Sequence, residues 1–288
     1  MSHISLFKTI FISCLILLFA GCSTIRFTEQ NLFFPFKEHK ISDTYSFNRY
    51  FIITDDSVRI ESWFLTRENA KINLLLFPGN GYNLRTRVPF FNKVGEELDA
   101  NIFAINYRGF GLSEGSPTIK GIVKDGITAL EYFKSHQQLN KGLPTFIVGY
   151  SLGSFVALNA GTENFIHGLI LIGALTSAEE MISYLKNKNV PFYAKPFVRI
   201  KADKNVYQLD NLSLVKKINK PILFVHGTQD DFVPPSMSEK LYNTSIAPTK
   251  NLLLIEGANH QTVLSDEKFI EKLVDGTKKF INSIKNHN

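Results

Sequence analysis

The sequence has few of the residues that would indicate a disulfide-stabilised or metal-binding protein. Its 288 residues include only two cysteines, Cys14 and Cys22, and both lie within the first 22 positions. A disulfide framework in the body of the chain is therefore excluded, and no His/Cys cluster has metal-ligand spacing. Gly-rich phosphate-binding motifs are missing too, so we expect neither a metal nor an organic cofactor.

Long runs of one charge sign and internal repeats are also missing. The 32 Lys and Arg residues against 26 Asp and Glu residues give a net charge of +6, but the basic residues are scattered. A nucleic acid is therefore not expected as a partner. With 44% hydrophobic and 20% charged residues, the chain has the composition of a globular protein, long enough for one large α/β domain.

The N-terminus carries an apolar run, "TIFISCLILLFAGCS" at 9–23, that is too short to span a bilayer comfortably. It follows a lysine and ends in small residues, which is typical of a secretory signal peptide. The ending "LFAGC" resembles the bacterial lipobox, which implies removal of residues 1–21 and lipidation of Cys22. Ser23 resembles the residue that permits passage to the outer membrane of Gram-negative bacteria. We therefore expect a lipid-anchored protein of the bacterial cell envelope, facing the periplasm; an ordinary signal peptide or an uncleaved anchor is the alternative.

Apolar strand-like runs alternate with helix-like segments from about residue 46 onward, the pattern of a mostly parallel sheet with helices on both faces. An opening hairpin is predicted at 46–54 and 58–66, followed by buried strands at 72–77, 101–106, 145–150, 168–174, 221–227 and 251–257. Helices are predicted at 84–98, 120–135, 152–161, 236–243 and 266–284. The fold class is α/β, a doubly wound sheet of about eight strands.

Two segments do not fit this alternation. Residues 177–216 are too long and too aromatic for a minimal crossover, and form either a helical cap over a pocket or a longer connection. Residues 22–45 form an irregular, aromatic lead that we expect to tether the domain and pack on it. The expected domain of residues 46–288 follows this lead.

Two serines match the nucleophile-elbow pattern Gly-x-Ser-x-Gly, in "GLSEG" at 111–115 and "GYSLG" at 149–153. An elbow requires a strand, a sharp turn and an immediate helix, with glycines where side chains would collide. Ser151 has a strand before it and a helix after it. Ser113 lies seven residues beyond a strand and is followed by Pro117, so it is interpreted as a loop serine.

A serine nucleophile requires a base and an acid that orients the base. His260 follows the last buried strand, on a loop at a strand's C-terminal end, where the sites of open α/β sheets form. The acid is expected on the loop after the preceding strand, in "FVHGTQDDFVPP", where Asp230 and Asp231 are neighbours. These residues alone do not distinguish the two aspartates.

The strings "FPGNGYN" (77–83), "NYRGFGLSEG" (106–115) and "HGTQDDFVP" (226–234) occur in the order found in the α/β-hydrolase superfamily, which the sequence resembles over roughly residues 48–284. The resemblance implies that Asp230 is the triad acid, because it matches the aspartate of an Asp-x-x-Val-Pro motif. It also implies an oxyanion hole formed by the backbone amides of Asn80 and Leu152. Pro78 stands where the family usually has histidine, and the side chain of Asn80 could instead hold the loop in place.

Together these observations predict a serine hydrolase that cleaves carboxylic esters or thioesters through Ser151, His260 and Asp230. A small-molecule or acylated substrate is the expected partner, with the membrane reached through the lipid anchor. A serine peptidase of the same fold and a non-catalytic envelope lipoprotein are the alternatives.

Overall fold

The computed structural model describes residues 23–37, 47–82 and 84–285. The expected signal peptide and its Cys22 lie outside these residues. In the described part of the chain, none of the helices is both long enough and apolar enough to cross a membrane.

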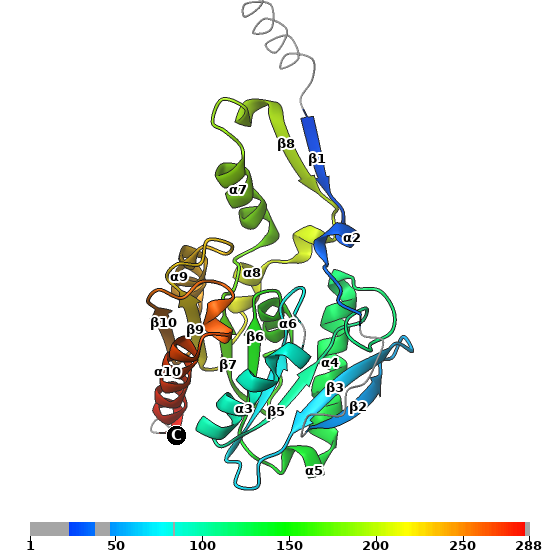
Figure 1. The fold of residues 1–288 in the computed structure, drawn as a ribbon, viewed down its shortest axis with the longest axis vertical. Helices are drawn as coiled ribbons and strands as arrows, with labels where there is room; N and C mark the ends of the chain where they lie inside the picture. The colour runs from blue at the N-terminus through cyan, green and yellow to red at the C-terminus, as the bar shows by residue number, and fades with distance from the viewer. Residues whose placement is uncertain (1–22, 38–46, 83, 286–288) are drawn as a thin grey trace, which may run out of the picture.

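An eight-stranded sheet forms the centre of the molecule (Figure 1). Its order is β10-β9-β7-β6-β4-β5-β3-β2, and its neighbours are parallel except where β3 pairs with β2 and with β5. The strands are β2 (Asn48–Ile53), β3 (Arg59–Leu65), β4 (Ile72–Phe77), β5 (Ala100–Ile105), β6 (Thr145–Tyr150), β7 (Ile166–Ile172), β9 (Ile222–Gly227) and β10 (Lys250–Ile255). The predicted doubly wound α/β fold is therefore confirmed.

Helices cover both faces of this sheet, which explains why its central strands are apolar on both sides. α3 and α10 pack on one face, and α4, α6, α8 and α9 lie on the other. Each face of the sheet therefore has its own hydrophobic core. Along β4, Leu74 and Leu76 pack in the core beneath α3 and α10, whereas Leu75 and Phe77 pack in the core beneath α4 and α6. The longer helices are α3 (Val88–Glu97), α4 (Ile119–Ser135), α6 (Gly153–Ala160), α7 (Ala178–Asn189), α9 (Pro235–Thr244) and α10 (Glu267–Lys285).

Residues 177–216, hereafter the insertion, separate β7 from β9. They form α7, the short helices η2 (Lys195–Phe197) and η3 (Val206–Gln208), the strand β8 (Val198–Ala202) and the helix α8 (Asn211–Val215). β8 is not part of the main sheet. It pairs in parallel with β1 (Ser23–Phe27), and the two strands project from the domain beside α7 (Figure 1).

The lead segment is held against the domain by polar contacts that the sequence did not predict. After β1 it forms the short helix α2 (Glu29–Leu32) and continues to residue 37. Oε1 of Glu29 accepts a hydrogen bond from the backbone N–H of Ile119 at 2.6 Å. Farther along, the backbone N–H of Gly111 donates to the carbonyl of Phe36, also at 2.6 Å. The lead therefore joins the insertion to the loop that contains "GLSEG".

Candidate active site

Ser151 lies on the turn between β6 and α6, at the carboxyl end of a central strand. Its φ angle is +51°, in the left-handed region that non-glycine residues rarely adopt, and its N–H donates to the carbonyl of Ile172 at 2.8 Å. A Cβ atom at Gly149 would lie 2.7 Å from that of Ala157, and one at Gly153 only 2.0 Å from the carbonyl oxygen of Phe77. Both glycines are required because β6, the turn and α6 pack this closely.

His260 lies between Ser151 and Asp230. Its Nε2 atom is 3.1 Å from Oγ of Ser151, and its Nδ1 atom is 2.6 Å from Oδ2 of Asp230. An ionised carboxylate can only accept hydrogen bonds, so Nδ1 carries the proton and Nε2 is free to accept one. The hydroxyl of Tyr150 donates to the carbonyl of His260 at 2.7 Å and holds this loop in place. The structure therefore brings together Ser151, His260 and Asp230, the aspartate that the family resemblance implied.

The carboxylate of Asp230 is almost completely buried and fully hydrogen-bonded. Oδ1 accepts from the backbone N–H groups of Phe232 and Val233, at 3.0 and 2.8 Å. Burial raises the pKa of Asp230, but hydrogen bonds from His226 and His260 outweigh this effect and hold the pKa well below its usual range. Asp230 therefore remains a carboxylate at neutral pH.

His226, on β9, is a site residue that the sequence reasoning missed. It is completely buried, and its Nε2 atom lies 2.8 Å from the carbonyl of Val233 and 3.2 Å from Oδ2 of Asp230. Both neighbours are acceptors, so Nε2 carries the proton, and Nδ1 accepts from the hydroxyl of Ser238 at 2.6 Å. A histidine inside an otherwise apolar strand was the available clue, since a buried imidazole requires polar partners.

Asp231 contacts α7 instead of His260. The ammonium group of Lys188 lies 3.2 Å from its carboxylate, and the hydroxyl of Tyr184 donates to its carbonyl at 2.9 Å. Both partners belong to α7. Of the two neighbouring aspartates, the structure therefore places Asp230 against the histidine and Asp231 against the insertion.

The expected oxyanion-hole residues flank Ser151 on two different turns. Leu152 begins the turn into α6, and Asn80 lies on the loop after β4, beyond Gly79. A Cβ atom at Gly79 would lie 3.2 Å from that of Ser151, so the loop passes close to the serine because it has glycine there. Within the described residues, the backbone N–H groups of Asn80 and Leu152 have no hydrogen-bond partner.

The side chain of Asn80 binds the lead segment. Its Oδ1 atom accepts from the backbone N–H of Phe34 at 2.9 Å, and its Nδ2 atom donates to the carbonyl of Leu32 at 2.6 Å. The side chain therefore fixes the loop, as one sequence interpretation allowed. The buried ring of Tyr82 lines the adjoining cavity.

Ser113 lies outside this site, and its hydroxyl makes structural hydrogen bonds. Its hydroxyl is buried, donates to the carbonyl of Asn106 at 2.7 Å and accepts from the N–H of Glu61 at 2.8 Å. The carboxylate of Glu61, also buried, accepts from the side chain of Asn106 at 2.7 Å and from the N–H of Leu112 at 3.0 Å. The "GLSEG" loop is therefore built around a buried glutamate, and its serine has no imidazole partner.

Two cavities open beside Ser151. The larger, of about 440 Å³, is the more polar of the two, and its lining includes Arg87, Asp231 and His260. The smaller, of about 140 Å³, is apolar. Half of its lining comes from the lead, α7 and η3, and the rest from loops and turns: Phe27, Leu32, Asn80, Ser151, Leu152, Leu175, Ala178, Met181, Ile182, Leu185, Val206, Leu209, Phe232 and Val233. Ser151, Asn80 and Phe232 line both cavities. The serine therefore lies where a polar opening meets an apolar recess.

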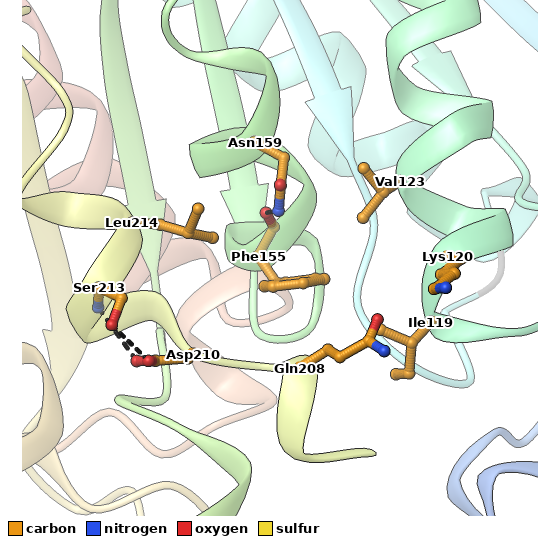
Figure 2. Close-up of a pocket in the computed structure, with 9 residues that line it drawn as sticks. All are labelled: Ile119, Lys120, Val123, Phe155, Asn159, Gln208, Asp210, Ser213 and Leu214. Atoms are coloured by element: carbon orange, nitrogen blue, oxygen red, sulfur yellow. Dashed lines mark hydrogen bonds between the residues drawn. The ribbon is translucent and has the colours of Figure 1, made fainter. Parts of the chain in front are cut away.

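A separate groove of about 360 Å³ lies between α4, α6 and residues 208–214 (Figure 2). Phe155 forms one wall, and Asp210 accepts hydrogen bonds from Ser213, as the dashed lines show. None of the three site residues lines this groove, and its lining contains no histidine to act as a base beside the Ser213 hydroxyl. The chemistry is therefore assigned to the cavities beside Ser151.

A mostly parallel doubly wound sheet with a serine on the strained turn after a central strand defines an α/β hydrolase. Comparison of the sequence with known families agrees with this class. The chain belongs to the family described as serine aminopeptidase, S33, which matches residues 88–213 and 208–267.

Curated relatives share a little over a quarter of their residues with this chain. Protein bem46 of Schizosaccharomyces pombe is 28% identical over 234 residues, covering 80% of this chain and 76% of the relative. Human alpha/beta hydrolase domain-containing protein 17B is 27% identical over 205 residues, covering 71% of this chain and 66% of the relative. The similarity therefore spans most of the domain.

Solved structures support the same fold. An esterase from Pyrococcus furiosus superposes with a TM-score of 0.66 at 16% identity, covering 87% of this chain and 98% of the esterase. DcsB, determined in complex with its substrate analogue, gives a TM-score of 0.65 at 20% identity, covering 83% of this chain and 99% of DcsB. At sequence identities of 16% and 20%, these structures show that the fold is shared and nothing more.

Proposed function

We propose that this hydrolase cleaves acyl esters or thioesters through Ser151, His260 and Asp230. The observation that carries the proposal is the position of His260, whose two ring nitrogens contact the serine hydroxyl and the buried carboxylate at 3.1 and 2.6 Å. A hydroxyl, an imidazole and a carboxylate in this order can generate a nucleophile at neutral pH.

In the proposed reaction, Nε2 of His260 takes the hydroxyl proton as Oγ of Ser151 attacks the substrate carbonyl carbon. The tetrahedral intermediate then collapses, and the imidazolium protonates the leaving alcohol or thiol. Water attacks the resulting acyl-serine by the same route, releases the carboxylic acid and returns the proton to Ser151. Asp230 keeps the proton on Nδ1 and stabilises the positive charge on His260.

The backbone amides of Asn80 and Leu152 are proposed to hold the oxyanion. They come from two turns on either side of Ser151 and have no hydrogen-bond partner among the described residues. Fixed donors directed at the developing negative charge lower the barrier, by about 3–4 kcal/mol for a single donor in one well-studied case. Because both donors are main-chain groups, Pro78 can replace the usual histidine without removing either donor.

The cavities favour an acyl substrate over a peptide. The apolar recess beside Ser151 contains no charged side chain and is suited to a hydrocarbon acyl group, with the leaving group in the polar opening. An aminopeptidase would require a carboxylate for the substrate ammonium, and in the described lining of the polar cavity the only carboxylate, that of Asp231, already pairs with Lys188. The family description still makes the peptidase the alternative to test.

We further propose that Cys22 carries a lipid anchor that holds the enzyme on the outer membrane, facing the periplasm. The support is the "LFAGC" sequence followed by Ser23. Incorporation of radiolabelled palmitate should be lost in Cys22→Ala; unchanged labelling would exclude this anchor.

A fluorophosphonate probe tests the nucleophile. It should label the wild-type protein and Ser113→Ala but not Ser151→Ala. Ser113→Ala removes both structural hydrogen bonds of that loop, so a thermal melt must accompany the labelling. Labelling of Ser151→Ala would disprove the assignment, and a wild-type protein that stays unlabelled would favour a non-catalytic lipoprotein.

Substrate choice is tested by turnover of nitrophenyl esters of increasing chain length against aminoacyl anilides. We expect ester hydrolysis that is abolished in Ser151→Ala and His260→Ala. Cleavage of anilides alone would replace the esterase proposal with the peptidase.

A further inference from the structure

The connection between α7 and β8, residues 190–197, exposes large aromatic side chains; we call it the insertion tip. Phe192 is 82% exposed and Tyr193 is 63% exposed, and their rings lie edge to face with centroids 5.5 Å apart. These are the highest exposures among the large exposed hydrophobic side chains of the described residues except for Phe34, at 67%. Aromatic side chains exposed together are typical of a surface that contacts another phase or partner.

The insertion tip lies at the same end of the two-stranded sheet as the start of β1. β1 and β8 run parallel, and their first residues, Ser23 and Val198, are paired. The insertion tip, which leads into Val198, is therefore at the end of the sheet where β1 begins. In the sequence, the apolar run of 9–22 leads directly into β1. Figure 1 shows this end of the sheet projecting away from the eight-stranded sheet. Any membrane attachment at the N-terminus therefore brings the insertion tip to the same surface.

The segments that flank the insertion tip in the sequence carry an excess of positive charge. Residues 183–204 contain six basic side chains, Lys186, Lys188, Lys195, Arg199, Lys201 and Lys204, and one acidic side chain, Asp203. Lys188 is paired with Asp231, and Asp203 accepts a hydrogen bond from the N–H of Glu29.

The two-stranded sheet is itself amphipathic. Arg26 lies opposite Lys201 on the face that also carries Arg199, whereas Ile25 lies opposite Ile200 on the other face. Side chains alternate between the faces of a strand, so this register separates the basic residues from the apolar ones. Ile25 remains 47% exposed.

We propose that the insertion tip docks on an anionic phospholipid surface, with Phe192 and Tyr193 in the headgroup region and the neighbouring basic residues on the lipid phosphates. Tyrosine and other aromatic rings prefer this depth of a bilayer, and lysine and arginine beside them are attracted to anionic lipids. A lipid surface is favoured over a protein partner because the chain enters this end of the sheet from the apolar run of 9–22, at the end of which the lipid anchor is proposed.

Docking would also bring the apolar recess close to the membrane. α7 connects the insertion tip to this recess, and its side chains Met181, Ile182 and Leu185 form part of the lining. If the proposed hydrolase function holds, on which this consequence rests, the substrates would be acyl esters or thioesters taken from the lipid surface.

The experiment places a fluorescent reporter on the insertion tip. The only tryptophan, Trp63, is 1% exposed, so Phe192→Trp adds one exposed reporter to a constant background. The full chain, carrying Ser151→Ala so that catalysis plays no part, is reconstituted in vesicles of phosphatidylcholine and phosphatidylglycerol with brominated acyl chains. Phe51→Trp, on β2 and 37% exposed, is the matched control.

We expect the Phe192→Trp protein to be quenched roughly twofold more than the Phe51→Trp control, and the difference to shrink in pure phosphatidylcholine. Arg199→Glu with Lys201→Glu, added to Phe192→Trp, should reduce the quenching in anionic vesicles. Equal quenching of the two reporters, or quenching unaffected by lipid charge and by the charge reversals, would overturn the proposal. Since no substrate is turned over, either result is independent of whether the hydrolase proposal holds.

Discussion

The Nε2 atom of His226 lies 3.2 Å from Oδ2 of Asp230, the same oxygen that contacts His260. Two imidazole rings therefore share one carboxylate oxygen, and only one of the rings reaches Ser151. Because His226 is completely buried, water does not compete for this contact. His226 is thus a positioning residue for Asp230, and its removal should lower the reactivity of Ser151.

We expect His226→Phe to lower kcat/KM by about tenfold to a hundredfold, since a hydrogen bond to a charged group contributes about 1.5–3 kcal/mol. His226→Gln, which retains an amide donor, should recover part of this loss. Ester hydrolysis and thermal melts of both variants provide the measurement. A His226→Phe protein with wild-type kinetics would show that Asp230 is positioned without His226.

Replacement of Gly153 tests the geometry of the turn. Gly153→Ala places a Cβ atom 2.0 Å from the backbone carbonyl of Phe77, which cannot move without disturbing β4, so we expect destabilisation of more than about 4 kcal/mol or failure to fold. In Gly142→Ala, where φ is +65° but no atom lies within 4 Å, only the backbone strain of about 1 kcal/mol is expected. Urea unfolding measures the loss of stability in the two variants. Similar losses in Gly153→Ala and Gly142→Ala would contradict the close packing at Gly153.

Stability should depend on the titration of Asp230 at acid pH. The pKa of Asp230 in the folded protein lies below the usual value of about 3.9. The contribution of Asp230 to the free energy of unfolding is therefore complete above that pH and is lost as the pH falls toward the folded-state pKa. The difference in free energy of unfolding between wild type and Asp230→Asn should therefore narrow below about pH 4. Urea titrations from neutral to acid pH measure it, and a constant difference would contradict the lowered pKa.

The apolar recess should limit the length of the acyl chain. Ile182→Trp, on the side of α7 that lines the recess, should fill it and shift selectivity toward shorter esters. The adjacent residue Ser183 is exposed, so Ser183→Trp is a control that should leave selectivity unchanged. Ratios of kcat/KM for short and long nitrophenyl esters report the effect, and equal ratios in both variants would place the acyl chain elsewhere.

The contact between Asn80 and the lead segment should also affect substrate binding. Asn80→Ala removes two hydrogen bonds to residues 32 and 34 but keeps the main-chain amide, so we expect a rise in KM of several-fold with a smaller change in kcat. Asn159→Ala, in the groove of Figure 2, is the matched control and should retain wild-type kinetics. A large fall in kcat with unchanged KM would instead assign the side chain to the oxyanion.

The sequence predicted the main sheet well because its strands are short apolar runs bounded by turn residues. The consecutive leucines at 74–76 need no long-range information to be read as a strand, since a strand buried on both faces is a nearly continuous apolar run. The pairing of β1 with β8 was missed because the paired residues are 175 positions apart and neither strand has the pattern of a buried strand. The lead therefore became part of the cavity lining only in the folded protein.

Local sequence by itself determined the turn at Ser151, because a strand, two glycines and a helix in immediate succession allow few other structures. It also placed His260 and the two aspartates on loops at the carboxyl ends of strands. Only the tertiary structure decided which aspartate contacts the histidine, that His226 supports that aspartate, and that Asn80 holds the lead beside Ser151. The physical reason is that hydrogen bonds depend on distances of about 3 Å between atoms, and folding alone sets these distances for residues far apart in the chain.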